Sequence, residues 1–225
     1  MTCAAAVCVD GRGVETHEAP AAKSHSQTLL PLIRSLLEAC GLTLGDIDAF
    51  AVSCGPGSFT GLRIGISTVK GLALANGRPA IGVPTLDAIA ACAVLTEDRV
   101  CPILDARKGE VYAALYARHE GRLLRVAADR VVSPEELCEL IREPTFFLGD
   151  GAERYGSILC SRLGGEVFKR ADARPLPVAS KVAELGAALL RARAPSHSIW
   201  IVPNYVRRSD AEINRERKRG GMRGL

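Results

Sequence analysis

The chain has 225 residues, of which 48% are hydrophobic and 24% are charged, and its net charge is +4. This composition is typical of a globular protein with a sizeable core and excludes a disordered or fibrous chain. No run of 18 apolar residues occurs and the N-terminus lacks the basic region of a signal peptide, so we expect a cytoplasmic protein without a transmembrane helix.

The positive charge is concentrated at the C-terminus. Residues 207–225 contain seven Lys or Arg and three Asp or Glu, so this tail accounts for the whole net charge and the rest of the chain is neutral. Such a tail is either a solvated, disordered segment or a contact to nucleic-acid phosphates. Composition alone favours the disordered segment.

Eight cysteines are present, and their spacing favours reduced thiols. No two are arranged as C-x-x-C, the spacing that structural zinc sites usually use, and most lie in apolar runs. We therefore predict free core thiols and no metal site.

The first part of the chain predicts a hairpin followed by a helix. Residues 3–9 and 14–19 are separated by an Asp-Gly pair, which is a hairpin signal. In the helix that follows, we expect Pro31 within the first turn and Gly41 just past the end, where each is tolerated best. The apolar stripe of this helix consists of Leu29, Leu30, Ile33, Leu36 and Leu37.

The most informative stretch begins at residue 49. Residues 49–53 are a short apolar run typical of a buried strand, and a Gly-Pro-Gly turn ends it. Ser58 and Thr60 are both candidate N-caps of the next helix. One face of that helix carries Leu62, Ile66, Val69 and Ala73.

Glycine recurs at every fourth position of this stretch, at Gly57, Gly61 and Gly65. A helical glycine costs roughly 1 kcal/mol relative to alanine, so the stripe indicates a neighbour that packs very close. A glycine-rich turn before a helix also collects N–H donors that suit a phosphate or a carboxylate. The spacing alone favours a tight strand-to-helix corner, and it matches neither a P-loop nor the dinucleotide-binding fingerprint.

Strands and helices continue to alternate in the rest of the chain. A strand at residues 79–83 and a helix capped by Thr85 complete a first α/β lobe, residues 1–97. Ser133-Pro134 is a strong helix start in the second lobe, residues 98–206, which precedes the basic tail. The other segments expected there are strands at 100–104, 110–117 and 145–148, helices at 152–163 and 180–193, and an extended segment at 200–206.

The residues alone do not indicate a set of catalytic side chains. His25 stands at a helix start, but a second metal ligand on the same helix would occupy the position of Leu29. A lone histidine there is more often a cap or a structural residue than a ligand. Asp105 and Arg107 share a turn and either clamp a ligand or form salt bridges, of which the salt bridges are favoured. No G-x-S-x-G nucleophile elbow occurs.

Several segments together resemble one bacterial family. The run G-P-G-S-F-T-G-L-R-I-G-I-S-T-V-K-G-L-A at residues 55–73 is followed by G-V-P-T-L-D-A-I-A at residues 82–90. With these segments, the chain from about residue 3 to about residue 210 resembles the TsaB (YeaZ) family of tRNA threonylcarbamoyladenosine biosynthesis proteins. Further matches are His25-Ser26 with Leu30-Pro31, Asp105-Ala106-Arg107 with Val111-Tyr112, and Pro203-Asn204-Tyr205-Val206-Arg207.

The resemblance implies a two-lobed actin-like (ribonuclease-H-like) α/β fold in which mixed sheets are flanked by helices. It also implies a non-catalytic role, since the catalytic paralogue TsaD carries an H-x-x-x-H metal site that Leu29 interrupts here. The partners it implies are a TsaD-like catalytic subunit, a TsaE-like ATPase and, for the isolated chain, a second copy in a homodimer. Contact with tRNA is expected indirectly or through the basic tail, and no membrane partner is expected.

The family uses helices of the N-terminal lobe for its protein contacts. The interface residues that this implies here are His25, Leu29, Leu30, Ile33, Gly61, Arg63, Gly65 and Val69. The candidate phosphate- or nucleotide-facing turn consists of Gly55, Gly57, Ser58 and Thr60. No cofactor is expected beyond weak binding of a nucleotide at this turn.

The chain departs from the family at its beginning. Family members start with a strand that ends in an Asp-Thr-Ser turn, whereas residues 3–9 match their second strand. Either the start codon was placed late or the first strand is missing. Loss of that strand exposes an unpaired sheet edge and removes part of any nucleotide site.

Two enzyme functions remain as alternatives. A metallopeptidase of the glycoprotease type needs a metal pair that the sequence does not show. A small-molecule kinase of the actin-like fold needs two phosphate loops, of which only the turn at residues 55–61 is found.

Overall fold

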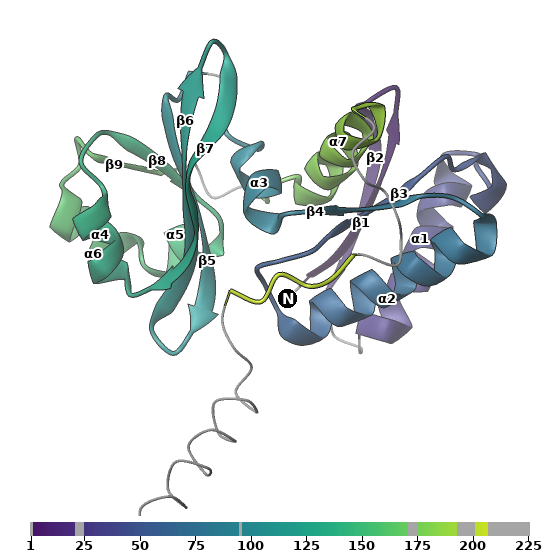
Figure 1. Ribbon diagram of the computed structural model, residues 1–225. Helices are drawn as coiled ribbons and strands as arrows, with labels where there is room; N and C mark the ends of the chain where they lie inside the picture. Colours follow the sequence, from purple (N-terminus) through teal and green to yellow (C-terminus); the bar gives the residue numbers. More distant parts are fainter. Residues whose placement is uncertain (1, 21–24, 95, 171–174, 193–200, 207–225) are drawn as a thin grey trace, which may run out of the picture.

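The computed structural model describes residues 2–20, 25–94, 96–170, 175–192 and 201–206. Figure 1 shows two lobes side by side, with β1–β4 in the first and β5–β9 in the second. This confirms the two-lobed actin-like α/β fold, with sheets flanked by helices, that the sequence predicts. The basic tail, residues 207–225, lies outside the described residues.

The N-terminal lobe contains two separate two-stranded sheets. β1 (Thr2–Val9) and β2 (Arg12–Pro20) form the predicted antiparallel hairpin. β3 (Phe50–Ser53) and β4 (Ala80–Val83) pair in parallel. The sequence predicted one mixed sheet, but among the described residues no ladder joins the two pairs. Within the part of the chain that the structure describes, each pair therefore has an edge that no other strand pairs with.

The first helix, α1 (His25–Ala39), differs from the prediction at Pro31, which lies inside the helix and not in its first turn. The helix begins at His25, four residues before Leu29, the first residue of the apolar stripe. Pro31 has no N–H to donate to the carbonyl of Gln27, but both residues are exposed, so water can satisfy that carbonyl. Gly41 has a positive φ of 66° just beyond the helix, as expected of a C-terminal glycine.

The second long helix, α2 (Phe59–Asn76), carries the face that its periodicity predicts. Its N-cap is Ser58, whose Oγ accepts a hydrogen bond from the Gly61 N–H at 3.3 Å, whereas Thr60 already lies inside the helix. The helix ends at Gly77, whose φ is 61°. The buried residues of α2 are Leu62, Ile66, Val69 and Ala73, which pack over the sheet of β3 and β4.

The second lobe is built on a five-stranded sheet in the order β7-β6-β5-β8-β9. β5, β6 and β7 form an antiparallel meander, and β8 and β9 add to it in parallel. The strands are β5 (Arg99–Arg107), β6 (Glu110–His119), β7 (Arg122–Val132), β8 (Thr145–Leu148) and β9 (Phe168–Arg170). The helices of this half are α4 (Pro134–Leu140), α5 (Asp150–Arg154) and α6 (Gly156–Leu163), and one short turn in the first half, η1 (Leu44–Asp46), is a 3₁₀ helix.

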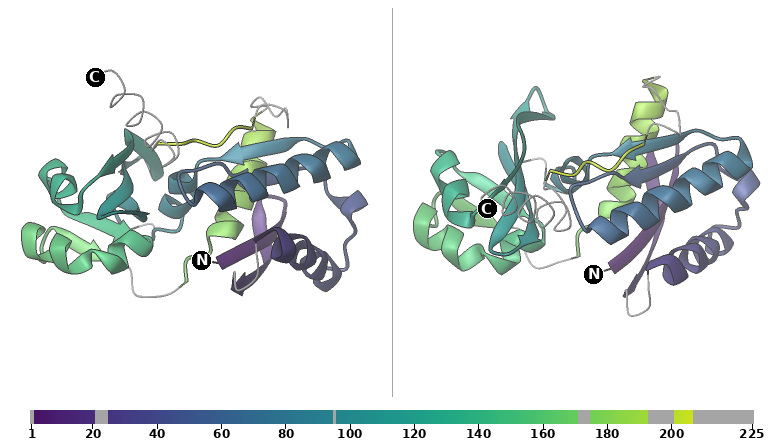
Figure 2. Two further views of the ribbon diagram at one scale, coloured as in Figure 1. Left: turned by 90° about the horizontal axis from the view of Figure 1, so that it is seen from below. Right: turned by 60° about the horizontal axis from the view of Figure 1, so that its bottom comes forward.

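The chain returns to the first lobe at its end. Helix α7 (Val178–Arg191) packs against β1, β2, β3 and β4, although the sequence places it in the range 98–206 of the second lobe. Figure 1 shows α7 beside the β1–β2 hairpin, and the views in Figure 2 agree. The boundaries at residues 97 and 206 stay a prediction, but the first lobe clearly contains a helix from the C-terminal half.

A short helix connects the lobes. α3 (Thr85–Ala90) follows β4 and contacts β5, β6 and β7 as well as α7. Its buried Leu86, Ile89 and Ala90 pack with Val100 and Tyr116 of the second lobe. Among the described residues, no helix combines the length and the hydropathy that a membrane span requires.

Candidate functional site

The glycine turn after β3 is held by the first residue of α3. The hydroxyl of Thr85 lies 2.8 Å from the Ser53 hydroxyl and accepts a hydrogen bond from the Gly55 N–H at 3.1 Å. The Thr85 N–H in turn donates to the Gly55 carbonyl at 2.8 Å. The turn that the sequence identifies as a phosphate-facing candidate is thus fixed by the chain's own donors and acceptors.

The C-terminal segment at residues 201–206 crosses this turn. The Asn204 N–H donates to the Cys54 carbonyl at 2.6 Å. Gly55 has φ of 113°, and a Cβ built there would lie 2.6 Å from the Asn204 carbonyl oxygen. Glycine is therefore required at residue 55 both by backbone conformation and by this close approach.

Aromatic and cationic side chains continue the contact beyond the turn. The rings of Phe59 and Tyr205 stack with centroids 4.8 Å apart. The Arg63 guanidinium lies 3.9 Å from the Phe59 centroid, and its Nε donates to the Tyr205 hydroxyl at 3.0 Å. Arg63 is an exposed residue, so this cluster forms a surface that joins the start of α2 to the C-terminal segment.

A polar network lies where the two lobes meet. Asp87 of α3 accepts hydrogen bonds from the Tyr116 hydroxyl at 2.5 Å and from Arg125 Nη2 at 2.5 Å. Arg125 also pairs with Asp129, which accepts a hydrogen bond from Asn204 Nδ2 at 3.1 Å. Burial and the neighbouring Asp87 carboxylate raise the pKa of Tyr116 above its ordinary value. The sequence gives no sign of this network, because its members are far apart in the chain.

A second polar cluster lies at the turn between β5 and β6. Asp105 pairs with Arg107 at 3.8 Å and with Arg154 at 3.4 Å, and it accepts a hydrogen bond from the Tyr155 hydroxyl at 3.1 Å. The salt bridge favoured for Asp105 and Arg107 is confirmed. The backbone at Arg107 has a positive φ of 64°, and the Arg107 N–H donates to Asp105 Oδ1 at 2.9 Å.

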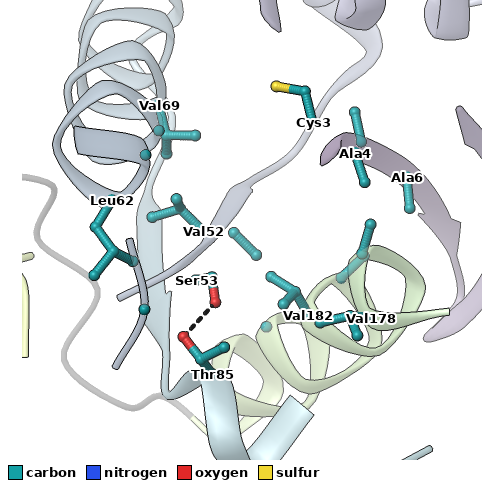
Figure 3. Close-up of a pocket in the computed structure, with 18 of the residues that line it drawn as sticks. Cys3, Ala4, Ala6, Val52, Ser53, Leu62, Val69, Thr85, Val178 and Val182 are labelled. Carbon is teal, nitrogen blue, oxygen red and sulfur yellow. Dashed lines mark hydrogen bonds between the residues drawn. The ribbon is translucent and has the colours of Figure 1, made fainter. Parts of the chain in front are cut away.

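A large cavity opens beside the glycine turn. Its volume is about 1730 Å³, and its walls include β1, β3 and one face of α7. Figure 3 shows Val52 and Ser53 on one side, Ala4 and Ala6 on the other, and Val182 of α7 between them. Most of the labelled side chains that surround the space are apolar.

The predicted interface residues lie in different environments. Leu30 is exposed on α1, and Arg63 is exposed on α2. Val69 is buried in the core between α2 and its sheet, and a Cβ on Gly65 would meet Val52 Cγ2 at 3.5 Å, an ordinary contact. The neighbour of α2 at Gly65 is thus β3 of the same chain, at a distance that leaves room for a Cβ, and not the very close neighbour that the glycine stripe predicts.

The remaining predicted residues of α1 lie nearer the lobe interior. Ile33 packs against the cluster of Val7, Leu36 and Leu37, and Leu29 is half-buried. The side chain of His25 lies outside the described residues. The assignment of these residues to an interface stays a prediction.

The cysteines are free thiols throughout the described residues. Cys101 is completely buried in the second lobe, and burial raises its pKa; burial also raises the pKa of Cys92 to about 11. Within the same residues, no three His, Cys, Asp or Glu side chains are grouped so that they could hold a metal ion.

Comparison with known proteins gives consistent matches over most of the chain. Residues 17–215 match the family described as TsaD, tRNA N6-adenosine threonylcarbamoyltransferase. The tRNA threonylcarbamoyladenosine biosynthesis protein TsaB of Bacillus subtilis (strain 168) is 34% identical, with 84% of this chain and 82% of the relative covered. TsaB of Haemophilus influenzae (strain ATCC 51907 / DSM 11121 / KW20 / Rd) is 30% identical, with coverage of 87% and 86%.

Solved structures show the same similarity in three dimensions. The structure titled YeaZ from Pseudomonas aeruginosa superimposes with a TM-score of 0.72 at 29% identity. It covers 91% of this chain and 94% of the other. A second Pseudomonas aeruginosa structure, described as an uncharacterized protein with similarity to peptidase YEAZ, gives a TM-score of 0.74 at 31% identity, with coverage of 92% and 94%.

Proposed function

Because this chain belongs to the TsaB family, we propose that it is a non-catalytic subunit of the machinery that forms threonylcarbamoyladenosine in tRNA, on the adenosine beside the anticodon. A role in that biosynthesis follows from relatives that share at least 30% identity over most of both chains. The similarity across both lobes is the observation that carries the proposal. The family match at residues 17–215 includes the glycine turn after β3, the segment at residues 201–206 and the contact between the lobes at α3.

The absence of catalysis by this chain is supported by the chemistry of α1. A pair of metal ligands one helical turn apart requires a histidine four residues after His25, and Leu29 stands there. An aliphatic side chain cannot ligate a metal ion. The glycoprotease-type peptidase gains no support from this helix, and the kinase alternative gains none from a turn whose Gly55 N–H and C=O are both bonded to Thr85.

We assign partner binding to the first lobe, with a TsaD-like catalytic subunit as the stable partner and a TsaE-like ATPase in the assembly. In the absence of the partner, a second copy of the chain occupies the same surface. Exposed apolar side chains on the two long helices of this lobe, α1 and α2, support this assignment. Leu30 on α1 is 50% exposed, and Leu74 on α2 is 80% exposed. Large apolar residues at such exposure gain free energy when a partner covers them.

Size-exclusion chromatography with light scattering tests this assignment. The chain alone is expected to elute as a homodimer and to convert to a 1:1 complex on addition of a TsaD-like protein. Leu30→Glu is expected to weaken both species, since it places a charge in the apolar contact. The matched control is Leu140→Glu, which changes a 40%-exposed leucine on α4 of the other lobe.

The proposal of partner binding fails if the unaltered chain neither pairs with a TsaD-like protein nor restores threonylcarbamoyladenosine in cells that lack their own subunit. If the chain binds its partner but Leu30→Glu and Leu140→Glu bind equally well, the assembly role stands and the assignment of the surface to α1 is wrong.

Two further contacts belong to this proposal. The tail at residues 207–225 carries a net charge of +4 and is proposed to reach tRNA phosphates, so its removal is expected to lower the salt dependence of tRNA binding by the complex. Weak nucleotide binding at the turn of Gly55, Gly57, Ser58 and Thr60 is likewise proposed. Calorimetric titration with ATP tests it, with Ser58→Asp as the variant that should abolish binding by charge repulsion.

A further inference from the structure

A cationic side chain at the start of α2 is held in place by two aromatic residues. The Arg63 guanidinium lies 3.9 Å from the Phe59 centroid and 6.0 Å from the Tyr205 centroid. Its Nε donates a hydrogen bond to the Tyr205 hydroxyl at 3.0 Å. Figure 1 shows the segment at residues 201–206, which carries Tyr205, beside the start of α2. Arg63 is therefore fixed by groups from α2 and from the C-terminal segment, although the residue itself is exposed.

The charge of Arg63 is not paired within the described part of the chain. None of the acidic side chains described there lies within salt-bridge distance of Arg63, and neither of its Nη groups has a hydrogen-bond acceptor among them. A guanidinium presents its donors as a planar fork that fits a carboxylate or a phosphate. Fixing such a side chain before binding reduces the conformational entropy that is lost when a partner binds. Arg63 is therefore positioned in advance to receive an anionic group.

The stripe of α2 that contains Arg63 indicates a protein as the source of that anion. Arg63 and Leu74 are about 20° apart around the helix axis and about 16.5 Å apart along it. Leu74 is 80% exposed, and Ser67 between them is also exposed. RNA phosphates would neutralise Arg63 but leave this leucine in water, whereas a protein surface covers both. Arginine and tyrosine are also enriched among the residues that dominate protein interfaces.

A second copy of this chain cannot supply the anion from the same two helices. The sequence of α2 contains no Asp or Glu, and that of α1 contains only Glu38. Glu38 is already paired with Arg34 at 2.8 Å. The two helices together carry Arg34, Arg63 and Lys70 against this single carboxylate. Two copies that meet through these helices therefore bring like charges together, which opposes their association.

We infer that the partner of the α1–α2 surface presents a carboxylate side chain to Arg63, and that Tyr205 is the positioning residue that holds the guanidinium for this contact. The inference rests on the proposed function, because it specifies the chemistry of the partner surface assigned there. It adds the C-terminal segment at residues 201–206 to that surface. It also gives a physical reason for a TsaD-like protein to displace a second copy, since a partner with an acidic residue opposite Arg63 neutralises the charge and a second copy does not.

Binding of the full chain to a TsaD-like protein, measured by calorimetric titration at low and at high salt, tests the contact. Arg63→Gln is expected to raise the Kd about tenfold or more at low salt, because the partner's carboxylate is left unpaired. It should also lower the salt dependence of the Kd, which a purely steric role for Arg63 would not change. The matched control is Arg122→Gln, which changes an exposed arginine of β7 in the second lobe and should alter the Kd less than about twofold.

A double-mutant cycle tests the role of Tyr205. Tyr205→Phe keeps the aromatic ring and removes the hydroxyl to which Arg63 Nε donates. In the otherwise unaltered chain this change is expected to raise the Kd about threefold to tenfold, and in the Arg63→Gln chain less than about twofold. Equal effects in the two chains overturn the positioning role of Tyr205.

The remaining outcomes separate this inference from the proposed function. If the unaltered chain binds no TsaD-like protein, the proposed function fails and the inference fails with it. If the unaltered chain and Arg63→Gln bind equally well, the assembly role stands and the carboxylate contact is wrong. A loss confined to tRNA binding by the complex assigns Arg63 to nucleic acid and overturns the inference. Equal weakening of the homodimer and of the complex by Arg63→Gln also overturns it, because these helices of a second copy offer Arg63 no unpaired acid.

Discussion

At the scale of single residues, Gly55 is a position where the fold tolerates little change. Its φ of 113° is strained for an L-residue, and a Cβ would lie 2.6 Å from the Asn204 carbonyl oxygen. Gly55→Ala is therefore expected to lower the free energy of unfolding by about 2 kcal/mol or more, because strain and a steric clash add. Urea denaturation measures the loss as a fall in midpoint at constant slope.

The matched control for this substitution is Gly77→Ala. Gly77 also has a positive φ, 61°, but no atom lies within 4 Å of a Cβ built there. Only the conformational cost applies, about 1 kcal/mol. Equal losses for the two variants would mean that the segment around Asn204 does not press on the turn as the structure shows.

Tyr116 links a single residue to the pH dependence of stability. Burial and Asp87 raise its pKa in the folded state, so the folded protein keeps the phenolic proton at a pH where the unfolded chain loses it. The contribution of Tyr116 to the free energy of unfolding is fully present below about pH 10, and it decreases as the pH rises further. Tyr116→Phe is expected to show a shallower decline above pH 10.

The same variant also tests the hydrogen bond at neutral pH. Loss of the Tyr116–Asp87 contact is expected to cost about 1–2 kcal/mol at pH 7, because the acceptor is charged. Urea denaturation at several pH values between 7 and 11 measures both effects. The buried thiols also lower stability above pH 9, but they are present in both proteins. Parallel pH profiles for the two proteins would contradict the raised pKa.

At the scale of elements, the capping box of α4 offers a defined local test. The Glu136 N–H donates to Ser133 Oγ at 3.1 Å, and the Ser133 N–H donates to Glu136 Oε2 at 2.9 Å. Ser133→Ala removes the first bond and is expected to lower the free energy of unfolding by about 1 kcal/mol. Thermal or urea unfolding measures it against Ser161→Ala, an exposed serine of α6. If the two variants are equally stable, the cap contributes nothing.

Elements with strong local patterns were predictable, whereas the exposed strand β7 and the three-residue strand β9 were not. The buried face of α2 and the capping box of α4 follow from the spacing of a few neighbouring residues. β7 was not predicted, because most of its residues are exposed and its apolar alternation is weak. The single helix expected at residues 152–163 is interrupted at Tyr155, where φ is −109°, and so forms α5 and α6.

The candidate site was predictable only in part for the same reason. The turn at Gly55 and the cap at Ser58 are local features that the sequence displays directly. The contact of Asn204 and Tyr205 with this turn spans about 150 residues and has no periodic signal. The resemblance to TsaB proteins did include Pro203-Asn204-Tyr205, which marks the segment as important without saying what it touches.

At the scale of the whole molecule, the lobes are joined by segments that cross between them. α3 follows a strand of the first lobe and packs on the second, while α7 and the segment at residues 201–206 return to the first. Asp87 lies at the centre of this junction, since it accepts hydrogen bonds from Tyr116 on β6 and Arg125 on β7. The integrity of the two-lobed arrangement should therefore depend on this carboxylate.

Asp87→Ala is expected to lower the free energy of unfolding by about 1–3 kcal/mol, because it leaves the buried Tyr116 hydroxyl and one side of Arg125 without their acceptor. Glu139→Ala, which removes an exposed carboxylate from α4, is the control and should change stability by less than about 0.5 kcal/mol.

A double-mutant cycle of Asp87→Ala with Tyr116→Phe measures how much of the lost stability comes from the contact between these two side chains. Because the two groups are in direct contact, the losses should be non-additive by about 1 kcal/mol. Additive losses would mean that the hydroxyl and the carboxylate do not interact in solution.

A junction that depends on Asp87 should also open when the residue is removed, which small-angle X-ray scattering detects as a larger radius of gyration. An unchanged radius with reduced stability would place the effect of Asp87 within one lobe and not between the two.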